Sequence, residues 1–347
     1  MSGSRIDSVG IWDATAALPE QVEVAARDAR GLEGLPHREA VENVVVVGMG
    51  GSGIAGDILL ATAGAFMAVP AVVVKSYTLP AFVGDRSLVF AVSFSGDTEE
   101  TIEAASDAAA QGATVVAITS GGELGRLATS SWGAPMVQLP DDIPQPRVAV
   151  GALAIPALVM LEEIGLYPGA TRWIELAVDQ LKRRRDQLVE PDGPAAELAR
   201  HLAPTIPLIH SAGALGGAAA QRWKTQVNEN ANAPAFWSVQ PELCHNEVQG
   251  WGRHNDVTRE ALSIVTLRHD AEHPQVMRRY ELVAELVAHA VTGIHEVRAE
   301  GEGELAQLLD LVLFGDFVSL HMAQQEGIDP GPVPTLSGIK QEFAPTP

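Results

Sequence analysis

The chain has one cysteine, few basic residues and no long apolar run, and each shortage excludes a class of protein. Because Cys244 is the only cysteine of the sequence, an internal disulfide and a multi-cysteine metal site are excluded. The 23 Lys and Arg against 44 Asp and Glu give a formal net charge of −21, which argues against binding to a nucleic-acid backbone. No segment approaches the roughly 18 uncharged apolar residues of a membrane span, and residues 1–7 lack the apolar core of a signal peptide. We therefore expect a cytoplasmic protein that binds neither nucleic acid nor membrane.

The 347 residues, 46% of them apolar, are enough for two globular domains. Apolar runs alternate with helical patterns, which predicts an α/β fold with doubly wound parallel sheets and flanking helices. Strands are predicted at 44–47, 70–75, 88–93, 114–119 and 135–139 in the first half, and at 205–210, 261–267 and 294–298 in the second. Helices are predicted at about 11–31, 53–64, 98–111, 121–130, 148–165, 214–228, 274–291 and 302–325.

These elements suggest five successive parts of the chain. We expect an N-terminal helical segment at 1–35, a first domain at 36–168, a connecting helix at 169–198, a second domain at 199–330 and a C-terminal tail at 331–347. The proline-rich start of the tail cannot be regular helix or central strand.

Two turns rich in glycine and hydroxyl groups follow apolar strands of the first half. They are Gly48-Met49-Gly50-Gly51-Ser52-Gly53 and Ser93-Phe94-Ser95-Gly96-Asp97-Thr98. A small-residue turn that opens a helix presents free backbone N–H groups, which bind phosphate. The first turn also matches the dinucleotide-binding pattern. However, no acidic residue stands at the end of the next strand to bind the ribose. Lys75 stands there instead, so that only an NADP-binding protein stays open as an alternative. Three hydroxyls in the second turn favour a phosphorylated small molecule over simple helix capping.

A second reactive stretch lies in the second half, at Asn228-Glu229-Asn230 and Glu242-Leu243-Cys244-His245-Asn246-Glu247. Glu229 has apolar neighbours and suits a general base, and His245 suits a proton carrier near neutral pH. The alternatives are a helix C-terminal residue for Glu229 and a helix cap for His245. Cys244 beside His245 invites comparison with a nucleophile, but a buried inert thiol is the more common role of such a residue. The remaining histidines lack metal-ligand spacing.

With Pro144-Gln145-Pro146-Arg147 added, these motifs resemble those of the bifunctional phosphoglucose/phosphomannose isomerases, a family of the sugar isomerase (SIS) domain superfamily. The resemblance covers residues 36 to 343 and implies two SIS domains and a homodimer with a shared active site. It implies an aldose–ketose isomerase that interconverts glucose 6-phosphate with fructose 6-phosphate, and it leaves mannose 6-phosphate open as a further substrate. The alternative is a non-catalytic sugar-phosphate-binding regulator of the same superfamily.

The resemblance also assigns roles to individual residues. Ser93, Ser95 and Thr98 would bind the phosphate, and Gly50, Gly51 and Ser52 would lie near the sugar. Glu229 would move a proton between C1 and C2 of the sugar, while Arg147 would stabilise the cis-enediolate. His245, contributed by the partner subunit, would open the ring with help from Lys340. No metal and no redox cofactor are implied. Asp97 stands where the superfamily often has asparagine, and it would place a negative charge near the phosphate.

Overall fold

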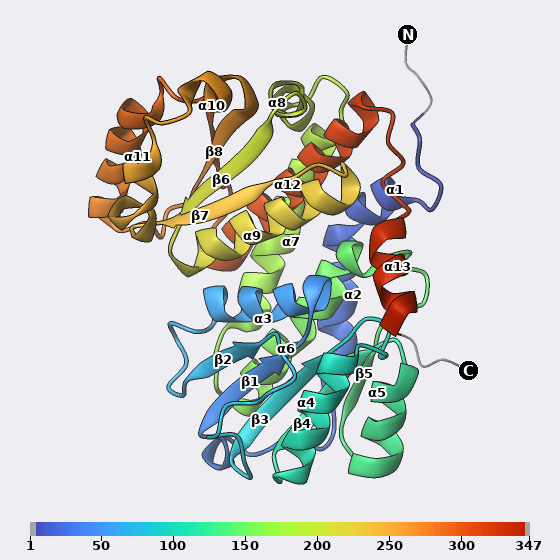
Figure 1. Cartoon of the computed structure of the whole chain (residues 1–347). Helices are drawn as coiled ribbons and strands as arrows, with labels where there is room; N and C mark the ends of the chain where they lie inside the picture. Colours follow the sequence, from blue (N-terminus) through green and yellow to red (C-terminus); the bar gives the residue numbers. More distant parts are fainter. Residues whose placement is uncertain (1–4, 344–347) are drawn as a thin grey trace.

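The computed structural model describes residues 5–343, which form two parallel sheets in separate halves of the molecule (Figure 1). The first sheet has the strand order β2-β1-β3-β4-β5, and every neighbouring pair is parallel. Its strands are β1 (Asn43–Val47), β2 (Ala71–Val74), β3 (Ser87–Val92), β4 (Thr114–Thr119) and β5 (Met136–Gln138). Its helices are α3 (Gly50–Thr62), α4 (Glu99–Ala110), α5 (Gly122–Leu127) and α6 (Val150–Ile164), with a π-helical turn at Ala128–Trp132. The predicted α/β class and all five predicted strands are confirmed.

The second sheet has the order β7-β6-β8-β9, again all parallel. Its strands are β6 (Ile206–Ala212), β7 (Phe236–Gln240), β8 (Leu262–Arg268) and β9 (Gly293–Arg298). Its helices are α9 (Gly213–Asn230), α10 (Asn255–Ala261), α11 (Pro274–Val287) and α12 (Glu304–Gln325). The sequence prediction omitted β7 and α10. Short 3-10 turns lie at Arg38–Ala40, Pro146–Val148, Glu242–His245 (η4) and Glu247–Gly250.

Helices outside the two sheets join the halves. The predicted leading helix is in fact two helices, α1 (Ile11–Ala16) and α2 (Leu18–Asp28), and the connecting segment is α7 (Ala170–Leu188) followed by α8 (Pro194–Leu202). The tail ends in α13 (Pro334–Phe343), which begins at a proline because the first helical position needs no N–H donor. The domain boundaries drawn from the sequence stay a prediction.

One apolar core runs through both halves and is centred on α12. This helix is long and apolar enough to cross a membrane, but its apolar window is entirely buried inside the chain, against α7, α8 and α9. Its packing on α9 is close at one point. A Cβ atom added at Gly315 would lie 2.3–2.5 Å from ring atoms of Trp223, whose indole N–H donates to the Leu311 carbonyl at 2.7 Å. The absence of a side chain at Gly315 therefore makes room for Trp223.

Each sheet has one topological switch point, where two neighbouring strands are followed by connections that run to opposite sides of the sheet. In the first sheet this switch point lies between β1 and β3, and in the second between β6 and β8. Ligands of doubly wound sheets bind beyond the carboxyl ends of the strands at such points. Both predicted turns of the first half lie at its switch point, since they directly follow β1 and β3.

Candidate active site

The two turns of the first switch point are joined to each other. The Ser52 hydroxyl at the start of α3 accepts a hydrogen bond from the Phe94 backbone N–H at 3.1 Å. On its other side the glycine turn touches the segment before α6, because a Cβ atom at Gly51 would lie 3.2 Å from the Pro146 carbonyl oxygen. The turns therefore form one continuous surface that ends beside Arg147.

The hydroxyl turn is tied together by its own hydrogen bonds. Ser93 is fully buried, its Oγ is 3.0 Å from Thr98 Oγ1, and it accepts from the Gly96 N–H at 3.1 Å. Ser95 is exposed and its Oγ accepts from the Asp97 N–H at 3.2 Å. Gly96 has φ +76°, and a Cβ atom there would come within 1.9 Å of the Gly121 carbonyl oxygen. Ser95 and Thr98 thus have access to solvent, while Ser93 holds the turn in shape.

Asp97 points its charge at a neighbouring helix. Its Oδ1 accepts from the Glu123 N–H at 3.0 Å, at the start of α5. The free N–H groups of a helix start partly offset a carboxylate. The predicted acidic side chain beside the hydroxyl turn is present, and its Oδ1 is occupied by this contact with α5.

Lys75, which the NADP-binding alternative would need for the 2′-phosphate, forms a salt bridge within the chain. Its Nζ lies 2.5 Å from Asp57 Oδ2 on α3, and burial raises the pKa of Asp57 against the opposing effect of Lys75. The ammonium group is therefore already paired, which counts against a role in binding a 2′-phosphate.

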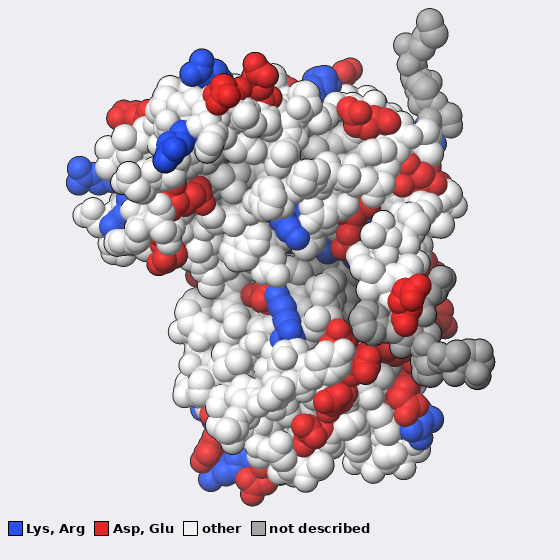
Figure 2. Space-filling view, viewed as in Figure 1, with Lys and Arg blue, Asp and Glu red and all other residues white. Residues whose placement is uncertain are grey.

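Arg147 and Glu229 meet where the two halves join, at the amino end of α6 and the carboxyl end of α9. Arg147 Nη1 lies 3.8 Å from Glu229 Oε2; the arginine side chain is 3% exposed and that of Glu229 27%. Figure 2 shows the surface hollowed between the halves, with basic side chains on both of its sides. Burial lowers the pKa of Arg147, Glu229 raises it and nearby Arg222 lowers it. The structure therefore places a buried cation beside a carboxylate that solvent can reach.

A buried network that the sequence reasoning missed holds this arginine. Arg147 Nε donates to Asn230 Oδ1 at 2.9 Å, and its Nη2 donates to the carbonyls of Pro330 and of Gly331, the latter at 3.0 Å. Arg222 donates to the Arg147 carbonyl.

The network continues into α12. Arg222 pairs with Asp316 through two hydrogen bonds of 3.0 and 2.8 Å, both side chains being buried. A signal for this existed, because Asp316 interrupts an apolar helix and a buried charge needs a partner.

His245 is not brought to this pair within the described part of the chain. His245 is the exposed last residue of η4, with no described contact to Glu229 or Arg147. The side chain of Lys340, in α13, lies outside the described residues.

The neighbours of His245 have partners of their own. Glu247 lies 2.8 Å from His210, and although burial raises the pKa of its carboxyl, the hydrogen bond and charge of His210 lower it overall. Cys244 donates to Gln240 at 3.1 Å and is only partly buried, and this burial raises the pKa of its thiol. A raised thiol pKa disfavours the nucleophilic thiolate.

Comparison with known proteins finds matches to both halves. Residues 39–131 match the SIS domain, and residues 191–343 match the bacterial phospho-glucose isomerase C-terminal SIS domain. The bifunctional phosphoglucose/phosphomannose isomerase of Caldicellulosiruptor bescii is 32% identical over 96% of this chain and 99% of that protein. The protein of the same name from Aquifex aeolicus is 33% identical over 87% and 90%.

Solved structures agree with this architecture. The C-terminal domain of glucosamine-fructose-6-phosphate aminotransferase from Francisella tularensis superposes with a TM-score of 0.69 at 16% identity, covering 92% of this chain and 96% of that one. At that identity the likeness concerns the fold alone.

Proposed function

The chain belongs to the family of bifunctional phosphoglucose/phosphomannose isomerases, and from this premise we propose that it interconverts glucose 6-phosphate and mannose 6-phosphate with fructose 6-phosphate. It is an isomerase. The observation that carries the proposal is the pair of Arg147 and Glu229, a buried cation 3.8 Å from a reachable carboxylate. A non-catalytic sugar-phosphate-binding protein has no need of such a pair.

The chemistry needs a base, a cation and a proton donor at the ring oxygen. The Glu229 carboxylate takes the proton from C2 of the open-chain aldose, and the C–H electron pair forms the C1–C2 double bond while the carbonyl electrons move to O1. Arg147 stabilises the resulting enediolate. Return of the proton to C1, with transfer of the O2 proton to O1, gives the ketose. Because glucose and mannose 6-phosphates differ only at C2, they share this enediolate.

The phosphate of the substrate binds at the first switch point. Ser95 and Thr98 supply reachable hydroxyls, the start of α4 supplies backbone N–H groups, and Ser93 shapes the turn. Gly50, Gly51 and Ser52 line the path from there to Arg147.

The active site is shared between two copies of the chain. This part of the proposal rests on His245, which is exposed and has no described contact with the Glu229–Arg147 pair of its own chain. His245 and Lys340 of the partner would open the sugar ring. Mixing Glu229→Gln chains with His245→Ala chains should restore activity in hybrid dimers, and verified hybrids without activity would refute a shared site. The burial of the apolar window of α12 inside the chain supports a soluble enzyme, and we place its action in the cytoplasm.

The decisive experiment replaces the base. Glu229→Gln keeps the shape of the side chain, so turnover should fall by about 10²–10⁴-fold while substrate binding persists. Exchange of the substrate C2 hydrogen with solvent should fall equally, because both report one proton transfer. Glu242→Gln is the matched control, since exposed Glu242 contacts Asn246 at 2.9 Å and no member of the pair. Parental turnover in Glu229→Gln would show that another group is the base.

A further inference from the structure

The described part of the chain buries four arginines, and three of them donate hydrogen bonds to carboxylates. Arg222 pairs with Asp316 at 2.8 Å, Arg184 with Glu300 at 2.6 Å and Asp310 at 3.4 Å, and Arg268 with Glu272 at 2.8 Å and Glu296 at 3.0 Å. This is the expected arrangement, because a buried charge is stable only when it is paired.

Arg147 is the exception, since all its hydrogen bonds go to uncharged acceptors. These are the Asn230 amide oxygen and the carbonyls of Pro330 and Gly331. The nearest carboxylate, Glu229, is 3.8 Å away, beyond hydrogen-bond distance. Nε and Nη2 are thus occupied without loss of the positive charge, and Nη1 remains directed toward Glu229.

The orientation of the Asn230 amide is itself fixed. Its Nδ2 donates to Ser319 Oγ at 3.0 Å, and that hydroxyl donates to the Asp316 carbonyl at 2.7 Å. Because Ser319 binds the amide nitrogen of Asn230, the amide oxygen Oδ1 of Asn230 faces Arg147. Asn230 is fully buried, so no solvent screens what stands at this position.

We propose that Asn230 is a positioning residue whose lack of charge matters: it aims Arg147 with a neutral oxygen, so that the full positive charge of the arginine acts on the enediolate. This rests on the proposed isomerase function. A carboxylate of the same shape would hold Nε equally well, yet it would pair with the arginine and weaken its pull on the developing oxyanion. When Glu229 takes up the substrate proton it becomes neutral, and the enediolate oxygen is then the anion that Arg147 faces.

The test separates charge from shape with Asn230→Asp and Asn230→Ala. Two non-reacting ligands serve as probes: a five-carbon aldonic acid 5-phosphate, whose carboxylate imitates the enediolate, and a hexitol 6-phosphate, which is uncharged at that end. Asn230→Asp should weaken binding of the aldonate by about 10²-fold, the scale of losing one oxyanion-stabilising donor, and should lower kcat similarly. Its effect on the hexitol phosphate and on KM should stay under about threefold. Asn230→Ala should weaken the aldonate by less than tenfold.

Asn228→Asp is the control, because it adds the same charge in the same motif while its amide contacts the Ala233 carbonyl at 2.9 Å instead of Arg147. The proposal would be overturned if Asn230→Asp weakened the binding of both probes equally. It would also be overturned if Asn230→Asp weakened aldonate binding no more than Asn230→Ala does. If the parent protein isomerises no hexose 6-phosphate, the proposed function fails, and the two probes still decide whether the charge at position 230 controls Arg147.

Discussion

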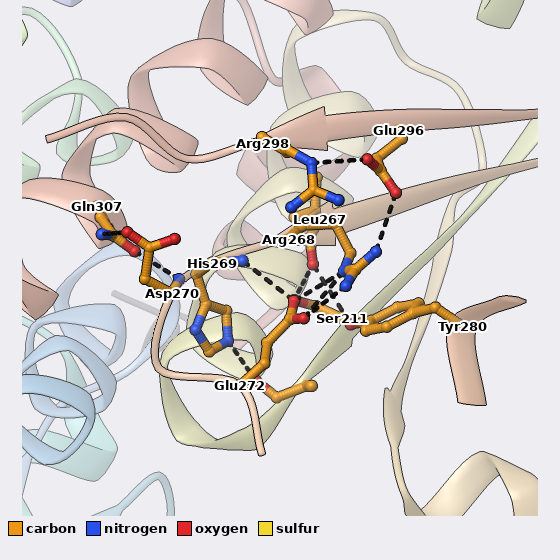
Figure 3. Close-up of polar contacts among 11 residues, drawn as sticks. Ser211, Leu267, Arg268, His269, Asp270, Glu272, Tyr280, Glu296, Arg298 and Gln307 are labelled. Atoms are coloured by element: carbon orange, nitrogen blue, oxygen red, sulfur yellow. Dashed lines mark hydrogen bonds and ion pairs between the residues drawn. The ribbon is translucent and has the colours of Figure 1, made fainter. Parts of the chain in front are cut away.

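The two switch points of the molecule occupy equivalent places in their sheets but carry opposite chemistry. The first is lined by glycine and neutral hydroxyls, of which Ser95 and Thr98 are within reach of solvent. At the second, Arg268 at the end of β8 donates to both Glu272 oxygens at 2.8–3.0 Å, and the His269 N–H adds a fourth bond at 3.1 Å (Figure 3). The Arg268 guanidinium lies over the aromatic ring of Tyr280, with its Cζ atom 4.1 Å from the centre of that ring.

This difference supports our proposal that the substrate phosphate binds in the first half and not in the second. At the second switch point the Glu272 carboxylate takes the donors that an incoming anion would need, and Arg268, Glu272 and His269 are all buried. At the first, none of the described hydrogen bonds of the Ser93, Ser95 and Thr98 hydroxyls reaches a carboxylate, and the Asp97 carboxylate binds to α5. In the second half a buried ion pair thus occupies the place where, in our proposal, the first half binds the phosphate.

The largest effect is expected from removing the donors of the first switch point. Ser95→Ala with Thr98→Ala should raise KM for glucose 6-phosphate by about 10²-fold or more, because each hydrogen bond to a charged group contributes roughly 1.5–3 kcal/mol. Steady-state kinetics measures the change, and circular dichroism checks that the fold persists. An unchanged KM would place phosphate binding elsewhere.

Breaking the pair at the second switch point should instead reduce stability. Glu272→Ala leaves the buried Arg268 without its main partner and should lower the free energy of unfolding by about 3–5 kcal/mol, with KM nearly unchanged. Denaturant unfolding measures this. Glu296→Ala removes the half-exposed partner of the same arginine and should cost about 1 kcal/mol or less. A large rise in KM in Glu272→Ala would mean that both halves bind substrate.

A hydroxyl of the second switch point should behave unlike those of the first. Ser211 is fully buried and donates to the Leu267 carbonyl at 2.8 Å. Ser211→Ala should therefore lower unfolding stability by about 1 kcal/mol and leave KM within twofold. An increase in KM comparable to that of the Ser95 and Thr98 variant would remove the distinction between the two points.

The smallest effect is expected at Asp97. Asp97→Asn keeps an acceptor for the Glu123 N–H but removes an exposed negative charge near the hydroxyl turn. KM should fall about two- to threefold, because exposed charges interact weakly, and the gain should fade at high salt. A KM that rises would show that this charge supports binding.

The fold was predictable where the pattern was strong. The run of four valines at 44–47 and its counterparts are buried parallel strands, which read as continuous apolar segments. β7 was missed because it is an edge strand that exposes Phe236 and Trp237 and is flanked by prolines, and its pairing with β6 decides its structure. The halves also share a core that no local pattern reveals.

The motifs of the candidate site were predictable from the sequence, but the contacts that hold Arg147 in place were not. Arg147 and Glu229, 82 positions apart, do lie together in the structure. The carbonyls of Pro330 and Gly331 could not be found, because a backbone acceptor leaves no trace in residue type. Asn230 lay inside a recognised motif, but its role depends on a contact with another helix.

Gly315 links the tight packing of the core to the orientation of the Arg147–Glu229 pair. Trp223 fits against α12 only because position 315 has no side chain, and two turns further along α9 stand Glu229 and Asn230, with Ser319 one turn along α12. We expect a carbon added at Gly315 to push α9 and α12 apart and to move Glu229 and Asn230 away from Arg147. Variants of this kind should fold and bind sugar phosphate yet turn over slowly. Relatives with a larger residue at this position should therefore carry a smaller one opposite it.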